Sequence, residues 1–396
     1  MSQLNAADQG WVRSWSASPQ APGASVSALE PFADATLRQV VRLSGGGRRV
    51  RVRFTNEYGT TPLTIGAARL GLAAPGGAIE PGSDRELTFA GLPNADVPAG
   101  APILSDPVDL PLAALSQLSI SLYLPGRVET CTSHGSDLDG GWSIPGDAVA
   151  APALPSTAVP LPAQGLISAV EVLPDGPATA VVTLGDSLTD GAGSTPDTGH
   201  RWPDLLAGRL AGRDGPAVHV CNQGISGNRV LNDGFGASAL ARFDRDVLAT
   251  PGLSHVVVLE GSNDLAISFA PRDDGPLAEF LAMFPGAPVT ADDLIAGYHQ
   301  LIARAHSRGI KIYGATLMPY GGSDVFAPAG ESARQAVNGW IRTGGGFDAV
   351  LDFDAVWRDP GDPARLRDEF DAGDHLHGND AGYRALADSV DLALFA

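Results

Sequence analysis

The first half of the chain alternates hydrophobic with polar residues, a pattern that predicts short antiparallel strands. Within residues 48–55, Val50, Val52 and Phe54 alternate with arginines. Within residues 118–124, leucine and isoleucine alternate with serine and tyrosine. A period of two indicates a strand with one buried and one solvated face.

The turns between these runs indicate how the strands connect. Residues 36–44 and 48–55 flank three consecutive glycines, which favours a hairpin. Further strands are expected at residues 62–72, 86–90 and 166–173. Short alternating strands with glycine and proline at their ends predict an antiparallel β-sandwich-like domain.

The second half changes to short, continuous apolar runs separated by helical patterns. The runs are typical of fully buried strands and lie at 180–184, 217–221, 256–259, 310–317 and 349–353. Helices are expected at 202–212, 292–308 and 379–395, where apolar residues recur every three or four positions. Strands joined through helices predict an α/β fold, a parallel sheet with helices on both faces.

A stretch rich in glycine, proline, serine and alanine separates the two patterns. It spans residues 134–165 and reads as a linker. We therefore expect two domains, a β-rich N-terminal domain at 1–175 and an α/β domain at 176–396. A chain of 396 residues is long enough for both.

Three strand ends of the α/β domain carry residues that suit catalysis. The run 180–184 stops abruptly at Gly185-Asp186-Ser187, and Gly224 and Asn263 lie in loops that follow the next two strands. In a parallel sheet the loops at the carboxyl ends of the strands converge. We expect these three loops to meet at one edge, with Ser187 as a candidate nucleophile.

A nucleophilic serine needs a base and an acid that orients the base. His377 follows Asp374 by three residues, a spacing that lets the carboxylate fold back onto the imidazole. His375 is the competing base, but it is adjacent to Asp374 and its ring is expected to point away. The order Ser, Asp, His agrees with hydrolases built on α/β sheets.

Three donors are available for an oxyanion: the backbone N–H groups of Ser187 and Gly224 and the side-chain amide of Asn263. Each also has an ordinary structural interpretation. Gly224 could be a simple turn glycine, and Asn263 could form an Asx turn. Their joint occurrence at successive strand ends favours the functional interpretation.

Charge and composition exclude several other functions. The net charge of −19, from 26 basic and 45 acidic residues, disfavours nucleic-acid binding. The sequence shows neither an apolar run of membrane-spanning length nor a signal peptide. It therefore predicts a protein that is cytoplasmic as written or secreted after removal of a leader. Cys131 and Cys221 form neither a disulfide framework nor a zinc motif, and no metal or cofactor is expected.

Four sequence blocks resemble those of the GDSL, or SGNH, hydrolases. They are GDSLTDG at 185–191, NQGISGN at 222–228, GSND at 261–264 and DHLH at 374–377. The first half, with WSASPQAP at 15–22 and VRFTNEYG at 52–59, looks like the N-terminal β-domain of two-domain members. One departure is Gly378, where many members have proline.

This resemblance implies a flavodoxin-like α/β/α hydrolase domain that cleaves short-chain acyl esters, acetyl esters above all. Ser187 would be the nucleophile, His377 the base and Asp374 its partner. Ser187, Gly224 and Asn263 would form the oxyanion hole, and an acyl-enzyme would be the intermediate.

Substrate and partners are less strongly indicated. Residues 262–291 read as a long loop whose Phe280, Met283 and Phe284 either wall a small acyl pocket or pack the loop onto the domain. The expected partner is a small-molecule or carbohydrate ester. Two alternatives stay open: a polysaccharide deacetylase of the acetyl xylan type, and a glycan-binding protein whose hydrolase domain is inactive.

Overall fold

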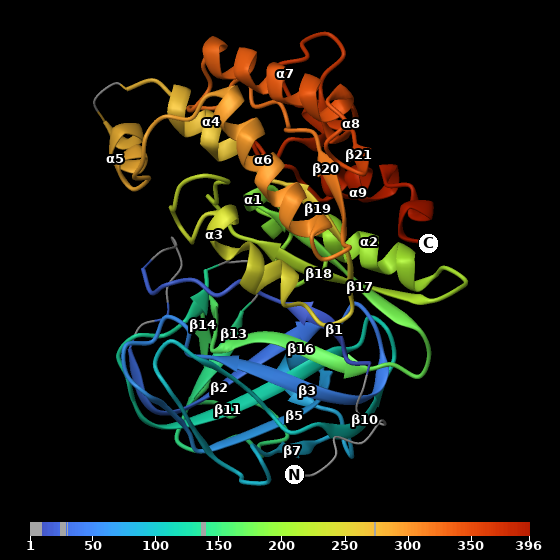
Figure 1. The fold of residues 1–396 in the computed structure, drawn as a ribbon. Helices are drawn as coiled ribbons and strands as arrows, with labels where there is room; N and C mark the ends of the chain where they lie inside the picture. The colour runs from blue at the N-terminus through green and yellow to red at the C-terminus, as the bar shows by residue number, and fades with distance from the viewer. Residues whose placement is uncertain (1–9, 24–28, 30, 136–139, 273–274) are drawn as a thin grey trace. The chain divides into compact units, whose positions relative to one another are not determined.

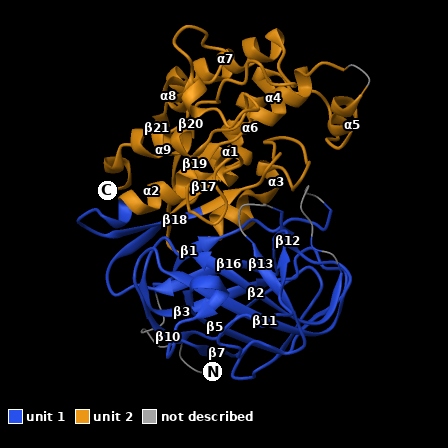
Figure 2. Ribbon diagram, turned by 180° about the vertical axis from the view of Figure 1, so that it is seen from behind, with its two compact units in different colours: residues 1–180, 210–221 blue, residues 181–209, 222–396 orange. Residues whose placement is uncertain are grey.

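The structure is a computed structural model that describes residues 10–23, 29, 31–135, 140–272 and 275–396 (Figure 1). The chain divides into two compact units, coloured separately in Figure 2. Unit 1 comprises residues 1–180 and 210–221, and unit 2 comprises residues 181–209 and 222–396. The domain division expected after residue 175 stays a prediction.

Unit 1 is rich in β-structure and contains two large antiparallel sheets. The five-stranded sheet has the order β1-β16-β3-β10, with β9 also paired to β3. Its strands are β1 (Val12–Ser16), β16 (Ile167–Leu173), β3 (Gly47–Thr55), β10 (Val108–Leu112) and β9 (Pro102–Leu104).

The seven-stranded sheet has the order β14-β13-β2-β11-β5-β6, with β7 also paired to β5. Its strands are β14 (Val159–Leu161), β13 (Gly141–Pro145), β2 (Phe32–Arg42), β11 (Gln117–Val128), β5 (Ala67–Ala74), β6 (Ala78–Ile79) and β7 (Arg85–Leu87). Smaller two-stranded pairings join β4 (Leu63–Ile65) to β8 (Ala95–Val97) and β12 (Ser133–His134) to β15 (Gln164–Gly165).

The predicted hairpin between residues 36–44 and 48–55 is wrong. The two segments form β2 and β3, but β2 pairs with β11 and β13, whereas β3 pairs with β16, β10 and β9. The glycines between them therefore carry the chain from one sheet to the other. Consecutive glycines allow either a hairpin or a crossover between sheets, so their presence did not distinguish the two arrangements.

The alternation of residues in β3 and β11 places side chains of both sheets in one hydrophobic cluster. Val50, Val52 and Phe54 of β3 and Leu118 and Ile120 of β11 are all fully buried there. In β11 the polar face is buried as well, contrary to the expected solvated face. Ser121 is inaccessible to solvent, and its hydroxyl accepts a hydrogen bond from the buried Arg38 of β2 at 2.9 Å.

Unit 2 contains most of a five-stranded sheet with the order β18-β17-β19-β20-β21. The strands are β18 (Ala217–Gly224), β17 (Ala178–Gly185), β19 (Leu253–Leu259), β20 (Lys311–Ala315) and β21 (Ala349–Leu351). β19, β20 and β21 pair in parallel. This is the 2-1-3-4-5 order of doubly wound sheets, in which ligands bind at the carboxyl ends of the strands.

Helices cover this sheet, and three of them follow from local signals. α2 (Trp202–Ala211) and α6 (Ala291–His306) were expected, and a capping box from Thr290 and Asp293 starts α6. α9 (Asp380–Ser389) begins at the predicted cap Asn379, but the chain turns extended at Val390, earlier than expected. In both ribbon views α6 and α9 lie on opposite sides of the central strands (Figures 1 and 2).

Six of the described α-helices were not predicted, among them the short helices α1 (Ser187–Asp190) and α3 (Ala239–Phe243). α7 (Pro328–Thr343) starts with a proline in its first turn, and α8 (Phe353–Trp357) is a single turn. α4 (Ser262–Phe269) and α5 (Pro276–Ala282) occupy the segment expected to be a long loop. Within the described part of the chain, no helix is long and apolar enough to span a membrane.

Candidate active site

Ser187 lies on a tight turn at the carboxyl end of β17. It is the first residue of the short helix α1 (Ser187–Asp190), whose cap is Asp186. The Asp186 carboxylate accepts the N–H of Leu188 at 3.0 Å. A Cβ atom on Gly185 would lie 2.1 Å from the Thr189 hydroxyl oxygen, so this position requires glycine. The Asp186 cap and the close packing at Gly185 therefore both fix the turn that carries Ser187.

The structure brings Ser187, His377 and Asp374 into one hydrogen-bonded chain. Nε2 of His377 lies 2.9 Å from Oγ of Ser187, and its Nδ1 lies 2.6 Å from Oδ2 of Asp374. All three residues come from segments that the sequence analysis singled out. The arrangement has the geometry by which an imidazole can remove a proton from a hydroxyl.

The Asp374 carboxylate is fixed by its own loop. Its Oδ1 accepts the backbone N–H groups of Leu376 at 3.0 Å and His377 at 2.8 Å. Burial raises the pKa of Asp374, but hydrogen bonds and charge from His377 outweigh burial and hold the pKa below the ordinary 3.8. The carboxylate thus stays ionised beside the imidazole.

His375, the competing candidate base, lies elsewhere. Its Nδ1 is 2.5 Å from Oδ2 of Asp371, and its backbone adopts a positive φ of 60°. The geometry therefore distinguishes the two histidines. Only His377 is hydrogen-bonded to the Ser187 hydroxyl in the described residues.

The end of β18 and the loop after it contain two glycines, Gly224 and Gly227, whose backbone N–H groups differ in hydrogen bonding. The N–H of Gly224 is buried and donates to Oδ1 of Asn222 at 2.8 Å. A Cβ there would lie 2.3 Å from the backbone nitrogen of Asp190, so close packing requires this glycine. Gly227 is half-buried, and the structure records no acceptor for its N–H among the described residues. Sequence reasoning missed Gly227, although it is in the same block.

Asn263 lies in the first turn of α4, directly after β19. Its side-chain amide donates one hydrogen to the backbone oxygen of Asn228 at 2.9 Å. That bond ties Asn263 to the loop after β18 and leaves the second amide hydrogen as a donor. The N–H of Ser187, at the start of α1, likewise has no acceptor within the described chain.

Three carboxyl groups are buried beneath these loops. Burial raises the pKa of Asp186 to about 7 and that of Glu260 well above 4.5. Burial also raises the pKa of Asp264 to about 6, although the N–H groups of Val230 and Leu231 oppose it. Burial is the largest cause of each shift, so all three carboxyl groups hold their protons to a higher pH than exposed carboxyl groups do.

Within the described residues, the predicted substrate residues Phe280, Met283 and Phe284 make no hydrogen bond or ring contact with Ser187, His377 or Asp374. Phe280 and Met283 are 40% and 48% exposed. Phe284 is buried and packs on Phe235, with 4.9 Å between ring centroids. The contact between Phe284 and Phe235 therefore favours the second interpretation, in which the segment packs onto its own unit.

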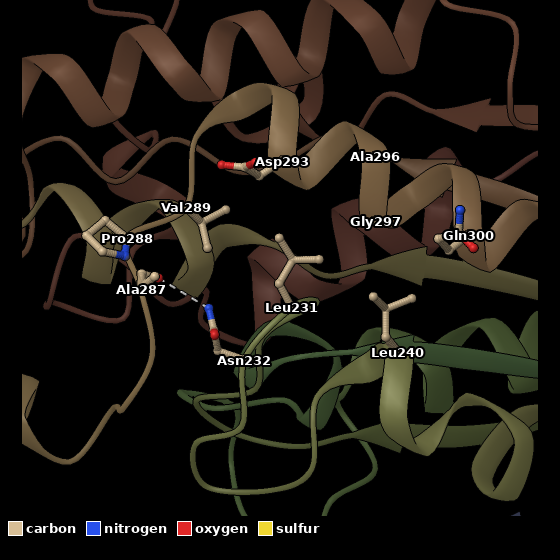
Figure 3. Close-up of a pocket in the computed structure, with 10 residues that line it drawn as sticks. All are labelled: Leu231, Asn232, Leu240, Ala287, Pro288, Val289, Asp293, Ala296, Gly297 and Gln300. Carbon is tan, nitrogen blue, oxygen red and sulfur yellow. Dashed lines mark hydrogen bonds between the residues drawn. The ribbon is translucent and has the colours of Figure 1, made fainter.

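Unit 2 contains a pocket of about 500 Å³, and Figure 3 shows residues that line it. Apolar side chains such as Leu231, Leu240 and Val289 face it, together with the amide of Gln300. None of the predicted site residues lines it, so this cavity does not supply an acyl pocket at Ser187. Among the described residues, no cluster of three or more His, Cys, Asp and Glu is placed to hold a metal ion. Cys131 and Cys221 are both buried and are not joined by a disulfide.

Comparisons with known proteins bear on this site. A sequence model of the GDSL-like lipase/acylhydrolase family matches residues 183–385, just over half of the chain. The search of curated proteins found no match.

Several solved structures are similar to part of the chain. An aryl esterase from M. smegmatis is 16% identical, with a TM-score of 0.39, and the match covers 53% of this chain and 95% of that one. A carbohydrate acetylesterase from Sinorhizobium meliloti is 16% identical, with a TM-score of 0.39 and coverage of 55% and 100%. A catalytic mutant of an acetylxylan esterase from Geobacillus stearothermophilus is 21% identical, with a TM-score of 0.39 and coverage of 54% and 93%.

Proposed function

The chain belongs to the GDSL-like lipase/acylhydrolase family, and we propose that it is a serine esterase acting on short-chain, acetyl-type carboxylic esters. The observation that carries the proposal is the hydrogen-bonded chain from Ser187 through His377 to Asp374. The family membership supports the reaction class, and the geometry supports Ser187 as the nucleophile and His377 as its base.

The proposed reaction has two halves. His377 removes the Ser187 proton while Oγ attacks the ester carbonyl carbon, and Asp374 stabilises the imidazolium that forms. The tetrahedral intermediate collapses, His377 protonates the departing alcohol, and an acyl-enzyme remains on Ser187. Water, deprotonated by His377, then attacks the acyl carbonyl and releases the carboxylic acid.

The oxyanion hole proposed for both steps uses donors from three loops. The N–H of Ser187 and the second amide hydrogen of Asn263 have no acceptor among the described residues, which supports both as donors. The N–H of Gly224 must first leave Asn222, whereas the N–H of Gly227 needs no such rearrangement. We therefore add Gly227 to the donors expected from the sequence. One well-placed donor is worth roughly 3 kcal/mol of the barrier.

The preference for a short acyl group is supported less directly than the roles of Ser187 and His377. It continues the expectation drawn from the four sequence blocks. Phe280, Met283 and Phe284, which were expected either to wall a small acyl pocket or to pack their loop onto the domain, do not decide the length of the acyl group. Phe280 and Phe284 pack on each other and on Phe235. Acetylated sugars fall in the same substrate class as simple acetyl esters.

The architecture proposed around this site has two parts. The hydrophobic cluster shared by β3 and β11 supports a β-sandwich arrangement in unit 1. The strand order of the parallel sheet supports a flavodoxin-like α/β/α arrangement around Ser187.

Hydrolysis of p-nitrophenyl acetate, butyrate and octanoate tests the function. Ser187→Ala is expected to reduce kcat at least about a thousandfold with an unchanged circular dichroism spectrum. Ser332→Ala, which removes an exposed hydroxyl in α7, is the matched control and should retain activity.

Two results would contradict the proposal. Wild-type activity in Ser187→Ala would exclude Ser187 as the nucleophile. A preference for octanoate over acetate would exclude the short acyl group. Acetate release from acetylated xylan, measured with the same variants, extends the test to carbohydrate esters.

A further inference from the structure

Arg242 of α3 (Ala239–Phe243) is fully buried beneath the strand ends of unit 2. Its guanidinium donates to three acceptors in two segments of the chain. The acceptors are the backbone oxygen of Gly185 at 3.1 Å, that of Gln223 at 2.6 Å and Oδ1 of Asn228 at 3.0 Å. One planar group thus bridges the turn after β17 and both ends of the loop after β18.

Each acceptor lies close along the chain to a group that the proposed oxyanion hole uses. Gly185 precedes Ser187 by two residues, and its oxygen also accepts the N–H of Ile225 at 3.0 Å. The oxygen of Gln223 belongs to the same peptide unit as the N–H of Gly224. The backbone oxygen of Asn228 holds the side chain of Asn263. The guanidinium is therefore linked to all three loops of the oxyanion hole.

Two acidic side chains face the same guanidinium. Asp246 lies 3.3 Å and Glu260 lies 3.5 Å from its nitrogens. Burial raises the pKa of Asp246, but Arg245 and Arg242 outweigh burial and lower it overall. Asp246 therefore supplies the negative charge that a buried guanidinium requires.

We propose that Arg242 is a positioning residue that holds the three strand-end loops together so that the oxyanion donors converge. The role is defined in terms of the esterase function proposed above. Five donors in a rigid plane can reach acceptors in several directions at once. Lysine keeps the charge, but its compact ammonium cannot bridge the same set, so Arg242→Lys separates charge from geometry.

Steady-state kinetics on p-nitrophenyl acetate test the proposal. Arg242→Lys is expected to lower kcat by about 10²-fold while KM changes less than about threefold, because oxyanion donors act mainly in the transition state. Arg334→Lys is the matched control. Arg334 is equally buried and donates to Leu317, Asp354 and Glu331, none of which belongs to the proposed site.

A milder variant covers the case in which Arg242→Lys fails to fold. Asn228→Ala keeps the guanidinium but removes its bond to the loop that holds Asn263. It is expected to lower kcat about tenfold, again with KM nearly unchanged.

Hydrogen exchange gives a readout that does not depend on activity. Arg242→Lys, or Asn228→Ala if the first fails to fold, should accelerate amide exchange in residues 185–191 and 222–228, and Arg334→Lys should not. If wild type hydrolyses no ester, the proposed function fails, and exchange still decides whether Arg242 holds the loops. Equal losses of kcat in Arg242→Lys and Arg334→Lys, or unchanged exchange in both segments, would overturn the positioning role.

Discussion

Asp186 should make the stability of the protein fall as the pH rises. The side chain is 1% exposed and caps α1 through one oxygen, while its second oxygen has no hydrogen-bond partner in the described residues. Asp186→Asn keeps an oxygen that can accept the Leu188 N–H and removes the ionisable group. The substitution therefore isolates the effect of charge.

The magnitude follows from the two pKa values. Burial raises the pKa of Asp186 from 3.8 to about 7 in the folded protein. Each pKa unit corresponds to about 1.4 kcal/mol, so ionisation costs the folded state about 4 kcal/mol at most. Because the folded state holds the proton more tightly, the stabilisation is complete below pH 3.8 and is lost as the pH rises to about 7.

Denaturant unfolding followed by circular dichroism at pH 4 to 8 measures this loss. Wild type should lose stability across the interval, and Asp186→Asn should lose several kcal/mol less. A smaller slope should remain in the variant, because Asp264 titrates near pH 6. Asp292→Asn, in the exposed first turn of α6, is the control. Parallel curves for wild type and Asp186→Asn would refute the assigned cost of burial.

Three further predictions concern the site and its surroundings. Asn263→Ala should lower kcat on p-nitrophenyl acetate by about 10²- to 10³-fold with little change in KM; a rise in KM alone would assign the side chain to ground-state binding. Asp374→Asn should leave the fold intact by circular dichroism but lower kcat by about 10⁴-fold, since the imidazolium loses its counter-charge and its tautomer control; near-normal turnover would show that the imidazole works without Asp374. Phe284→Ala should lower the free energy of unfolding by about 3 kcal/mol or more, whereas Phe280→Ala, at an exposed ring, should cost much less; equal thermal shifts would contradict the different burial of the two rings.

The strands and several helices of unit 2 were predictable because their signals are local. The run 180–184 reads as a buried strand and forms the inaccessible part of β17. The α6 stripe and the Asn379 cap identified their helices in the same way. Such signals depend on neighbours within about four residues, which are visible in a single sequence.

Pairing between strands that are far apart in the chain was harder to predict from the sequence. Residues 36–44 and 48–55 were correctly predicted as strands, but their hairpin was wrong, since each pairs with partners far along the chain. The helix α4 was missed because it begins the segment 262–291, in which prolines at 271, 276, 285 and 288 indicated a loop. Its start depends on Gly261, whose φ of 122° suits glycine.

The sequence by itself determined which side chains are available for the chemistry: a serine after a buried strand, and a histidine three residues beyond an aspartate. Only the tertiary structure decided that His377 rather than His375 reaches Ser187, since both histidines have an aspartate within four residues. It also decided that Arg242 bridges loops up to 57 residues away. These choices depend on long-range packing, because directed hydrogen bonds inside a protein form only where the folded backbone brings donor and acceptor within about 3 Å.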